Sequence, residues 1–349
     1  MRGQVFMTAL LKIGRHAIGP GQPVFIVAEG CDNHLGNLAV AMEMVLQAKL
    51  AGADAIKFQH HLPDEEMLPD IPMSDNFQQP LYEFLKQHAL TLSDHIMLMR
   101  HCEACGIQYL CTPFSYKAAQ ELNEIGVQAF KIGSGEMTDI PSLRKISHFK
   151  KPMILSTGMA TLEEIDETVV ALQEEGASPA LLNCVSEYPP NYEDLNLRVI
   201  EILRDRYPQL VIGHSDHTPD LYTAFAAVAL GACIIEKHVI LNKLQPGPDQ
   251  SVSIDMGDLH TLVSGVRKIE LALGRQKEVQ PRERQIREWA FRSVVSVLEI
   301  GPGQEITADM VWTKRPGTGI PSKQLPAVIG RRARVRIPAN QLLRWEDLE

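Results

Sequence analysis

The stretch Gly231-Ala-Cys-Ile-Ile-Glu-Lys-His238 decides the fold, and Gly213-His-Ser-Asp-His217-Thr218 precedes it along the chain. In both places a short, apolar, β-prone run ends abruptly in charged or imidazole side chains. A buried strand that ends in this way is typical of a parallel barrel, in which the carboxyl ends of the strands carry the site. We therefore expect His217 and His238 to lie on neighbouring strands at one rim. With carboxylates nearby, two imidazoles indicate a divalent metal site, although this stretch alone equally fits two unrelated histidines held by hydrogen bonds.

The same pattern recurs along the first three quarters of the chain. Eight short apolar runs are spaced mostly about 20–30 residues apart, as a βα repeat requires. The runs are Val24–Ala28, Ala53–Phe58, Ile107–Cys111, Ala129–Ile132, Met153–Leu155, Ala180–Cys184, Leu210–Ile212 and Cys233–Ile235. Helical patterns separate them, among them Leu38–Leu50, Tyr116–Ile125, Leu162–Glu175 and Leu221–Leu230. Eight such units predict a (β/α)8 TIM barrel over residues 1–274 rather than a doubly wound sheet, which usually has fewer strands.

Two local features refine this prediction. Thr161-Leu-Glu-Glu164 has the form of a capping box that begins a helix, and Gly176 ends that helix. The one long interval, from His60 to about Leu90, is rich in proline and predicts an insertion over the barrel mouth. Its prolines are Pro63, Pro69, Pro72 and Pro80.

The pattern changes after Leu273. Residues 275–290 are highly charged and predict a linker or a solvated helix. Short β-prone runs follow at Ser293–Leu298, Val311–Lys314 and Ala333–Ile337, with turns rich in glycine and proline between them. They predict a small β-rich domain over residues 291–349, too short for a large core of its own.

The composition limits the classes of function. The 349 residues carry a formal net charge of -9, which argues against nucleic acid as a general partner. No apolar run reaches the roughly 18 residues of a membrane span, and Met1–Ala17 has no signal-peptide pattern. Four of the six cysteines fall in or beside predicted strands, where a reduced thiol is usual, so we expect a cytoplasmic protein. The one CxxC, Cys102 to Cys105, lacks a second pair of ligands, and we predict no metal or redox role for it.

The residues at the carboxyl ends of the eight runs are polar or charged side chains of the types that bind ligands and catalyse reactions. Two lysines among several hydroxyls favour an anion that carries phosphate and carboxylate. Several carboxylates indicate acid–base work or a polyhydroxylated partner. A single lysine at a strand end is more often paired with a core glutamate, but polar residues at all eight ends are the mark of a barrel site. The set is Glu29, Lys57, Gln59, Thr112, Lys131, Ser134, Glu136, Ser156, Asn183, Ser186, Tyr188, Ser215, His217, Glu236 and His238, with Asp249 in the following loop.

Ten motifs in order then identify a family. They are Asn33-His34-x-Gly36, Lys57-x-Gln59, Thr112-Pro-Phe-Ser115, Lys131-Ile-Gly-Ser-Gly-Glu136, Leu155-Ser-Thr-Gly-Met159, Tyr188-Pro189, Ser215-Asp-His-Thr218, Glu236-Lys-His238, Pro246-Gly-Pro-Asp249 and Lys314-Arg-Pro-Gly317. With them the chain closely resembles the sialic acid synthase (N-acetylneuraminate synthase) family over nearly its whole length. The last segment resembles the antifreeze-like (SAF) domain of these synthases. The resemblance implies a transferase that condenses phosphoenolpyruvate with an N-acetylated hexosamine and gives a nonulosonic, sialic-type acid plus phosphate by C–O cleavage.

The resemblance also implies roles at matching positions. His217 and His238 are the expected ligands of a divalent cation, manganese first and magnesium or cobalt as substitutes. The expected phosphoenolpyruvate contacts are Lys57, Thr112, Lys131, Ser134, Ser156 and Ser186. The expected sugar contacts are Glu29, Gln59, Glu136, Tyr188 and Asp249, and Asn183 and Ser215 complete the substrate-binding set. Our catalytic candidates are Glu29, Lys57, Glu136 and Glu236. Arg315 and Phe291 match residues that reach the sugar pocket from a partner subunit, which implies a domain-swapped homodimer.

The chain departs from the family in three places, and these leave the acceptor open. The usual Glu-x-Gly-x-Asn-His reads Glu29-Gly-Cys-Asp-Asn-His34, so that Gly30 and Cys31 change the turn after the first strand. Asn183 and Gln250 stand where histidine is common. The acceptor is therefore either N-acetylmannosamine or a 2,4-diacetamido-6-deoxyhexose, the latter giving a legionaminate- or pseudaminate-type acid.

Two alternatives remain. Another phosphoenolpyruvate-dependent 3-deoxy-ulosonate synthase would act on a phosphorylated aldose, and would need a second basic phosphate pocket that the sequence does not show. A catalytically inactive sugar-binding homologue is the other, because fold-level likeness alone does not establish activity.

Overall fold

The computed structural model describes residues 9–71 and 79–349. The chain divides into two compact units, Met1–Leu273 and Gly274–Glu349. Pro72 of the predicted insertion lies outside the described residues. So do the first residues of Met1–Ala17, the segment without a signal-peptide pattern.

The first unit is a near-closed barrel of eight parallel strands. They are β3 (Phe25–Glu29), β4 (Ala55–His60), β5 (Gln108–Pro113), β6 (Phe130–Ile132), β7 (Met153–Ser156), β8 (Ala180–Cys184), β9 (Ile212–Asp216) and β10 (Ile234–His238). Their order in the sheet is β5-β4-β3-β10-β9-β8-β7-β6. Each predicted run overlaps or directly precedes one of these strands, so the predicted barrel is confirmed. Hydrogen-bonded pairing connects all neighbouring strands of the barrel except β5 and β6, which lie side by side without it.

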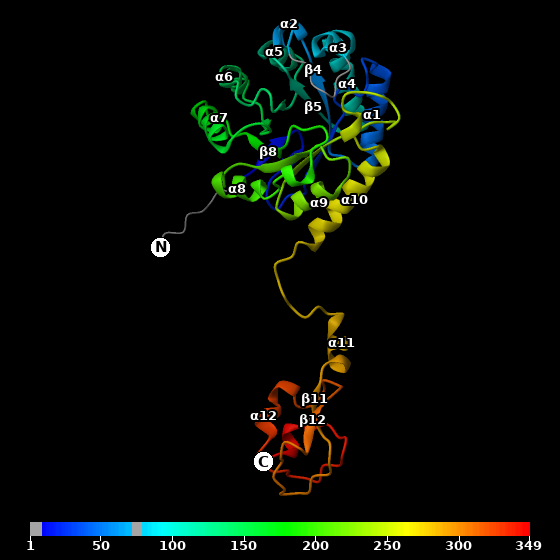
Figure 1. Ribbon diagram of the computed structural model, residues 1–349, viewed down its shortest axis with the longest axis vertical. Helices are drawn as coiled ribbons and strands as arrows, with labels where there is room; N and C mark the ends of the chain where they lie inside the picture. The colour runs from blue at the N-terminus through cyan, green and yellow to red at the C-terminus, as the bar shows by residue number, and fades with distance from the viewer. Residues whose placement is uncertain (1–8, 72–78) are drawn as a thin grey trace. The chain divides into compact units, whose positions relative to one another are not determined.

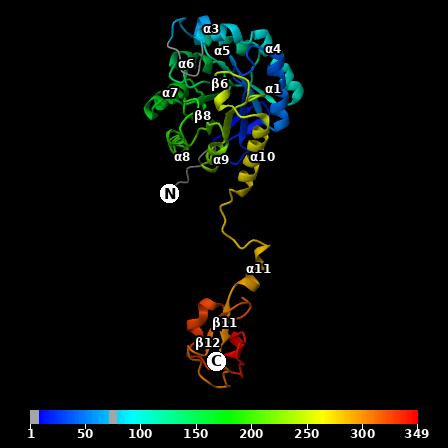
Figure 2. The same ribbon diagram turned by 45° about the vertical axis from the view of Figure 1, so that its right-hand side comes forward.

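Helices cover the outside of the barrel (Figures 1 and 2). They are α1 (Leu38–Ala51), α4 (Leu92–Cys105), α5 (Tyr116–Glu124), α6 (Ile140–Ser147), α7 (Leu162–Glu174), α8 (Val199–Arg206), α9 (Tyr222–Ala229) and α10 (Met256–Ala272). The predicted capping box is present at the start of α7, where Thr161 accepts from the Glu164 backbone N–H and Glu164 accepts from that of Thr161. Gly176 follows the helix at φ 75°, a left-handed conformation that suits glycine.

Alternation along the strands builds two apolar layers. On β3, Ile26 and Ala28 face the helices, whereas Phe25 and Val27 face the barrel interior. The interior layer holds one apolar side chain from most strands, and the apolar residues of an amino-terminal hairpin pack against it. That hairpin is β1 (Leu11–Ile13) paired with β2 (His16–Ile18). Because the hairpin and this layer fill the amino-terminal end, open space remains at the carboxyl ends of the strands.

The predicted insertion contains two short helices, α2 (Pro63–Glu66) and α3 (Leu81–His88). Leu81 and Leu85 of α3 line the cavity at the carboxyl ends of the strands. The prediction of a segment over the barrel mouth is therefore confirmed for its described part.

The second unit has its own small core. After α11 (Glu283–Ala290), β11 (Ser293–Ser296) pairs antiparallel with β12 (Val311–Lys314), and α12 (Leu325–Val328) follows. The predicted run Ala333–Ile337 is not a strand; it makes isolated bridges from Ala333 to Leu348 and from Ile337 to Ile300. Across the described residues, the helices are too short or too polar to span a membrane.

One ion pair is fully buried between the barrel and its helices. Lys237 Nζ lies 3.3 Å from Asp216 Oδ1, and both side chains have no exposed surface. Asp216 also accepts from the Thr218 backbone N–H at 2.8 Å and from Thr223 Oγ1 at 2.7 Å. Burial alone would raise the pKa of Asp216, but the Lys237 ammonium lowers it overall. The carboxylate is thus fixed in its charged form behind the strand ends.

Removing this carboxylate should leave a buried, unpaired ammonium. We expect Asp216→Ala to lower the free energy of unfolding of the barrel by about 3–5 kcal/mol, measured by urea denaturation. The exposed pair Arg198–Glu201 on α8 is the control, and Glu201→Ala should cost less than about 1 kcal/mol. Equal losses in the two variants would contradict this role.

Candidate active site

A cavity of about 510 Å³ lies at the carboxyl ends of the barrel strands. This size suits a small-molecule site. The predicted site residues that line it are Glu29, Lys57, Gln59, Thr112, Lys131, Ser134, Glu136, Ser156, Ser186, Tyr188, Ser215, His217, Glu236, His238 and Asp249. The structure thus brings together side chains that the sequence spreads over more than two hundred positions.

Two lysines form the floor of this cavity. Lys57 Nζ and Lys131 Nζ each lie 3.5 Å from a carboxylate oxygen of Glu236, one oxygen for each ammonium. Lys57 also pairs with Glu29. All four side chains are at most 5% exposed, so water screens these charges poorly.

Hydroxyl groups surround the two ammonium groups. Lys57 donates to Thr112 Oγ1 at 3.0 Å and Lys131 to Ser156 Oγ at 2.7 Å. Ser215 donates to Glu236 Oε1 at 2.9 Å. These contacts fix the lysine head groups at the strand ends instead of leaving them free to rotate.

A second group of donors lies at Gly158, directly after β7. Its backbone N–H donates to Ser134 Oγ at 3.1 Å. A Cβ on this residue would collide with the hydroxyls of Ser134 and Ser186. Glycine therefore keeps open a cradle of one N–H and two hydroxyls, which suits phosphate oxygens.

The two glutamates beside the lysines differ in charge. Burial alone would raise the pKa of Glu236, but the ammonium groups of Lys131 and Lys57 lower it to about 2. Burial raises the pKa of Glu29 to about 7, against the opposing effect of Lys57. Near neutral pH the group therefore carries two cations and one full anion, and burial makes the Glu29 carboxyl easier to protonate than an ordinary glutamate. The surplus positive charge suits an anionic ligand.

The rings of the two predicted metal ligands, His217 and His238, pack in an edge-to-face arrangement with centroids 5.2 Å apart. Burial lowers the pKa of His217 to about 4 and lowers that of His238 well below its ordinary value, so both rings are neutral at pH 7. His217 Nδ1–H donates to the Val185 carbonyl at 2.7 Å, so Nε2 carries a lone pair, which accepts from the Tyr188 hydroxyl at 3.4 Å. His238 Nδ1 is buried and has no hydrogen-bond partner among the described residues.

His238 also belongs to a group with metal-ligand spacing. One ring nitrogen of His238, the Cys31 sulfur and a carboxylate oxygen of Asp249 lie within 4.8 Å of one another. Neutral imidazole, thiol and carboxylate are the usual donors to a divalent cation. The residues present therefore fit such an ion, with His217 adjacent to the group rather than part of it.

The opposite wall carries a histidine that our sequence analysis missed. His61 Nε2 lies 3.0 Å from Gln59 Oε1, and Nδ1 lies 3.0 Å from Glu66 Oε1. Its ring stacks on Phe114 with centroids 4.2 Å apart. Burial alone would lower the pKa of His61, but the Glu66 hydrogen bond and the nearby Asp32 charge raise it overall. Because Lys57 and Gln59 face inward on β4, one further step of the alternation would have predicted His61.

Three predicted site residues lie outside the cavity lining. Asn183 alternates with the inward-facing Leu182 and Cys184 on β8, and its carbonyl accepts from His214 Nδ1 at 2.9 Å. Phe291 and Arg315 belong to the second unit. There Arg315 Nε donates to the Ala290 carbonyl at 3.0 Å, and Phe291 is 54% exposed. Their predicted approach to a partner's site stays a prediction.

With this geometry in view, comparison with known proteins gives the family. Residues 44–278 match the NeuB family, and residues 291–349 match the SAF domain. The chain belongs to the NeuB family. Both the family and the fold expected from the sequence are thereby confirmed.

Relatives within the NeuB family are synthases of sialic- and legionaminic-type acids. The chain is 35% identical to the N,N'-diacetyllegionaminic acid synthase of Legionella pneumophila, over 95% of this chain and 96% of that one. It is 32% identical to the human N-acetylneuraminate-9-phosphate synthase, over 94% of each. The crystal structure of the N-acetylneuraminic acid synthetase of Leptospira borgpetersenii, bound to citrate, matches 81% of this chain and 96% of its own with a TM-score of 0.72 and 32% identity. These relatives support an enzyme of the synthase type.

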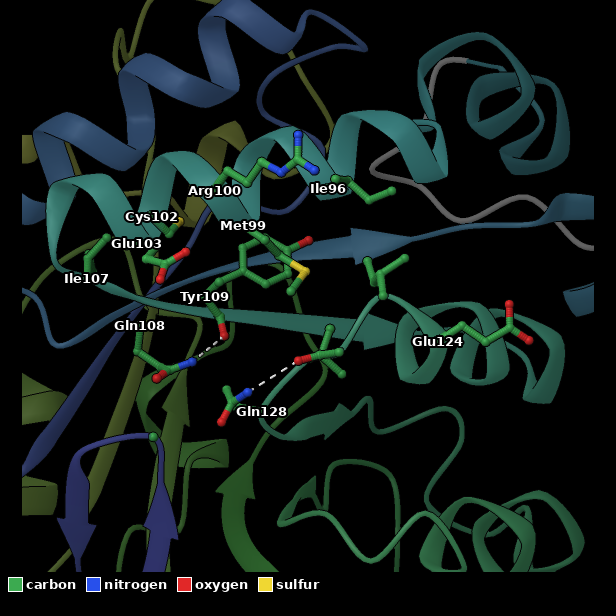
Figure 3. Close-up of a pocket in the computed structure, with 14 residues that line it drawn as sticks. Ile96, Met99, Arg100, Cys102, Glu103, Ile107, Gln108, Tyr109, Glu124 and Gln128 are labelled. Atoms are coloured by element: carbon green, nitrogen blue, oxygen red, sulfur yellow. Dashed lines mark hydrogen bonds between the residues drawn. The ribbon is translucent and has the colours of Figure 1, made fainter.

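A larger cavity, of about 660 Å³, lies elsewhere on the barrel. Figure 3 shows its lining, which comes from α4, the start of β5 and the loop before β6. It holds Cys102 of the CxxC pair but none of the predicted site residues among those described. All six cysteines are free thiols. The chemistry of this NeuB-family chain therefore gathers in the smaller cavity.

The partly buried Glu136 gives the site a measurable pH dependence. Burial raises the pKa of Glu136 from 4.5 to about 7. The folded state binds the Glu136 proton more tightly than the unfolded state does, so protonation stabilises the fold. This contribution to the free energy of unfolding is fully present below about pH 4.5 and is lost as the pH rises through 7. Glu136→Gln imitates the protonated form, so we expect it to be more stable than the wild type above pH 7 by about 1–3 kcal/mol and to approach it at low pH.

Denaturant unfolding at about pH 4.5 and pH 8 measures this difference. The exposed Glu163 in the first turn of α7 provides a matched control, and Glu163→Gln should change stability by less than about 1 kcal/mol at either pH. A pH-independent effect of Glu136→Gln would contradict the assignment.

Proposed function

We propose that this chain condenses phosphoenolpyruvate with an unphosphorylated N-acetylated hexosamine to give a nonulosonic acid and phosphate. One observation carries the proposal: Lys57 and Lys131 are buried side by side at the strand ends, each 3.5 Å from Glu236. A rigid pair of ammonium groups in a poorly solvated mouth suits a small, highly charged anion. The names of the relatives support the product class.

The phosphoenolpyruvate would bind over the lysines. Lys57 and Lys131 would neutralise its phosphate and carboxylate. The Gly158 N–H and the hydroxyls of Ser134 and Ser186 would donate to the remaining oxygens. Because protein contacts already hold the lysines, little reorganisation is needed when the ligand arrives.

The rest of the cavity favours an uncharged, polyhydroxylated acceptor. Its described lining residues include no lysine or arginine beyond Lys57 and Lys131, and of its three histidines only His61 has a raised pKa. Asp32, Glu136 and Asp249 also line the cavity, and their carboxylates would repel an acceptor phosphate. This favours N-acetylmannosamine or a 2,4-diacetamido-6-deoxyhexose. It speaks against the phosphorylated aldose of the alternative ulosonate synthases.

The reaction forms one C–C bond and breaks one C–O bond. Carbon 3 of the enol attacks the open-chain aldehyde carbon, and the aldehyde oxygen takes up a proton. Water adds at carbon 2 and loses a proton, and phosphate then leaves with its bridging oxygen to yield the 2-keto acid. Glu136 and Glu29, each with a pKa near 7, are suited to give and take these protons. Glu236 stays ionised and holds the two lysines in place.

A divalent cation fits the other side of the same mouth. When bound, such an ion polarises a carbonyl oxygen as a Lewis acid. His238 and the adjacent His217 would hold it, beside Cys31 and Asp249: both rings are neutral, His238 Nδ1 has no partner among the described residues, and His217 Nε2 would exchange the Tyr188 hydroxyl for the ion. The preference for manganese over magnesium or cobalt remains a prediction from the family resemblance.

The C-terminal SAF domain would complete the acceptor pocket of a partner subunit in a homodimer. Arg315 lies over the Trp289 ring at 5.4 Å, and Trp289 is 53% exposed. With the exposed Phe291 these residues form an apolar surface beside a cation, which suits docking on another protomer. The proposed enzyme is thus a cytoplasmic, domain-swapped homodimeric transferase.

An acceptor panel tests the reaction. We expect phosphate release from phosphoenolpyruvate with one of the two unphosphorylated hexosamine types, at least about 100-fold faster than with N-acetylmannosamine 6-phosphate or arabinose 5-phosphate, because one unpaired buried anion costs several kcal/mol. Release with arabinose 5-phosphate alone would favour the ulosonate alternative, and release with N-acetylmannosamine 6-phosphate alone would contradict the unphosphorylated acceptor. No release with any acceptor would favour the inactive homologue.

Mixed dimers test the domain swap. Lys57→Ala and Arg315→Ala should each be nearly inactive alone. Co-expressed, they should recover about a quarter of wild-type activity, because half of the dimers are mixed and each then has one intact site. Recovery requires that Arg315 act in trans. Mixed dimers without activity would show that Lys57 and Arg315 serve the same chain's site.

A further inference from the structure

Cys31 occupies a position that geometry links to the metal and that the family resemblance does not assign. It follows β3, and its sulfur is within 4.8 Å of both a carboxylate oxygen of Asp249 and a ring nitrogen of His238. Bonds from a divalent ion to sulfur, nitrogen and oxygen donors are about 2.0–2.3 Å long. Small side-chain rotations therefore let one ion reach all three residues.

We propose that Cys31, together with His238 and Asp249, binds the divalent ion of this protein through a sulfur ligand. The inference rests on the proposed function only for the reaction that the ion serves. A second observation, on the same imidazole ring, also indicates an unmet ligand. His238 is 6% exposed, and its Nδ1 has no hydrogen-bond partner within residues 9–71 and 79–349. A buried nitrogen in that state is costly unless an ion or other partner satisfies it.

The backbone at Cys31 argues that the side chain is present for its sulfur. The residue has φ 37°, in the left-handed region that glycine adopts most readily. Its N–H donates to Glu29 Oε1 at 2.6 Å, a bond that any non-proline residue makes there. Packing does not single out cysteine either, because the side chain is completely buried next to polar groups. Neither the backbone nor the packing at this position requires cysteine, so its thiol group is the feature that a glycine could not supply.

The charges of the three ligands suit a divalent ion. A thiolate and the Asp249 carboxylate together supply two negative charges, and the neutral His238 ring supplies a lone pair. Sulfur ligands select softer ions, and oxygen ligands select magnesium and manganese. The sulfur ligand therefore assigns this chain a preference for Co²⁺, Zn²⁺ or Fe²⁺ over Mn²⁺ and Mg²⁺, in place of the manganese preference expected from the family resemblance.

Cobalt titration of the full-length, metal-free protein tests the ligand without any turnover. A thiolate bound to Co²⁺ gives a sulfur-to-metal charge-transfer band in the near ultraviolet, which nitrogen and oxygen ligands do not give. We expect this band in the wild type with one ion per chain. Cys31→Gly should abolish it and should fold normally, since glycine tolerates the left-handed backbone.

The same titrations give a second, quantitative readout. Cys31→Gly should weaken Co²⁺ or Zn²⁺ binding by about 100-fold or more, and Mn²⁺ binding by less than about 10-fold. Cys184→Ser is the matched control, because Cys184 is also a buried thiol at this barrel mouth and lies outside the group of three. It should keep both the band and the affinities.

Three results would overturn the proposal: no band in the wild type, a band that persists in Cys31→Gly, or equal losses for soft and hard ions. A wild type that shows the band but releases no phosphate with any acceptor would instead contradict the proposed reaction and leave the sulfur ligand standing.

Discussion

The site depends on one carboxylate held between two ammonium groups. Glu236 faces Lys57 with one oxygen and Lys131 with the other, and the three come from three different strands. In a poorly solvated interior, two like charges so close are tolerated only because an anion lies between them. Every other feature of the mouth is arranged around this group. The hydroxyls fix the lysines, and the filled amino-terminal half of the barrel leaves only the carboxyl end open.

The parallel barrel explains why so much of this could be predicted. All eight strands end at the same rim, so a residue's distance from the rim and its parity along the strand decide whether it joins the site. Lys57, Lys131 and Glu236 each sit an even number of positions from an inward-facing apolar residue on their own strand. Asn183 fails the same test, which is why it faces His214 instead of the cavity. Our prediction of Asn183 considered only its position near the end of a strand, and not whether its side chain faces inward or outward.

Residues on loops escaped prediction for a different reason. Cys31 and Asp249 follow different strands and are far apart along the chain. Their spacing in the sequence does not predict that both lie close to His238. The described part of the insertion was predicted only as a cover, and its Glu66 turned out to hold His61. In the second unit, Ala333–Ile337 has the composition of a strand, but only its two end residues find bridge partners. Local patterns define elements well, whereas contacts between loops depend on the complete fold.

The central claim is that the two buried lysines bind phosphoenolpyruvate before any sugar arrives. Calorimetric titration of the protein with phosphoenolpyruvate, without acceptor, tests it most directly on the wild type and on Lys131→Gln. The account predicts one site per chain in the wild type and a loss of affinity of about 100-fold in the variant, as expected for removing one partner of a buried charge pair. Unchanged affinity in Lys131→Gln would show that the anion binds elsewhere and would contradict the account.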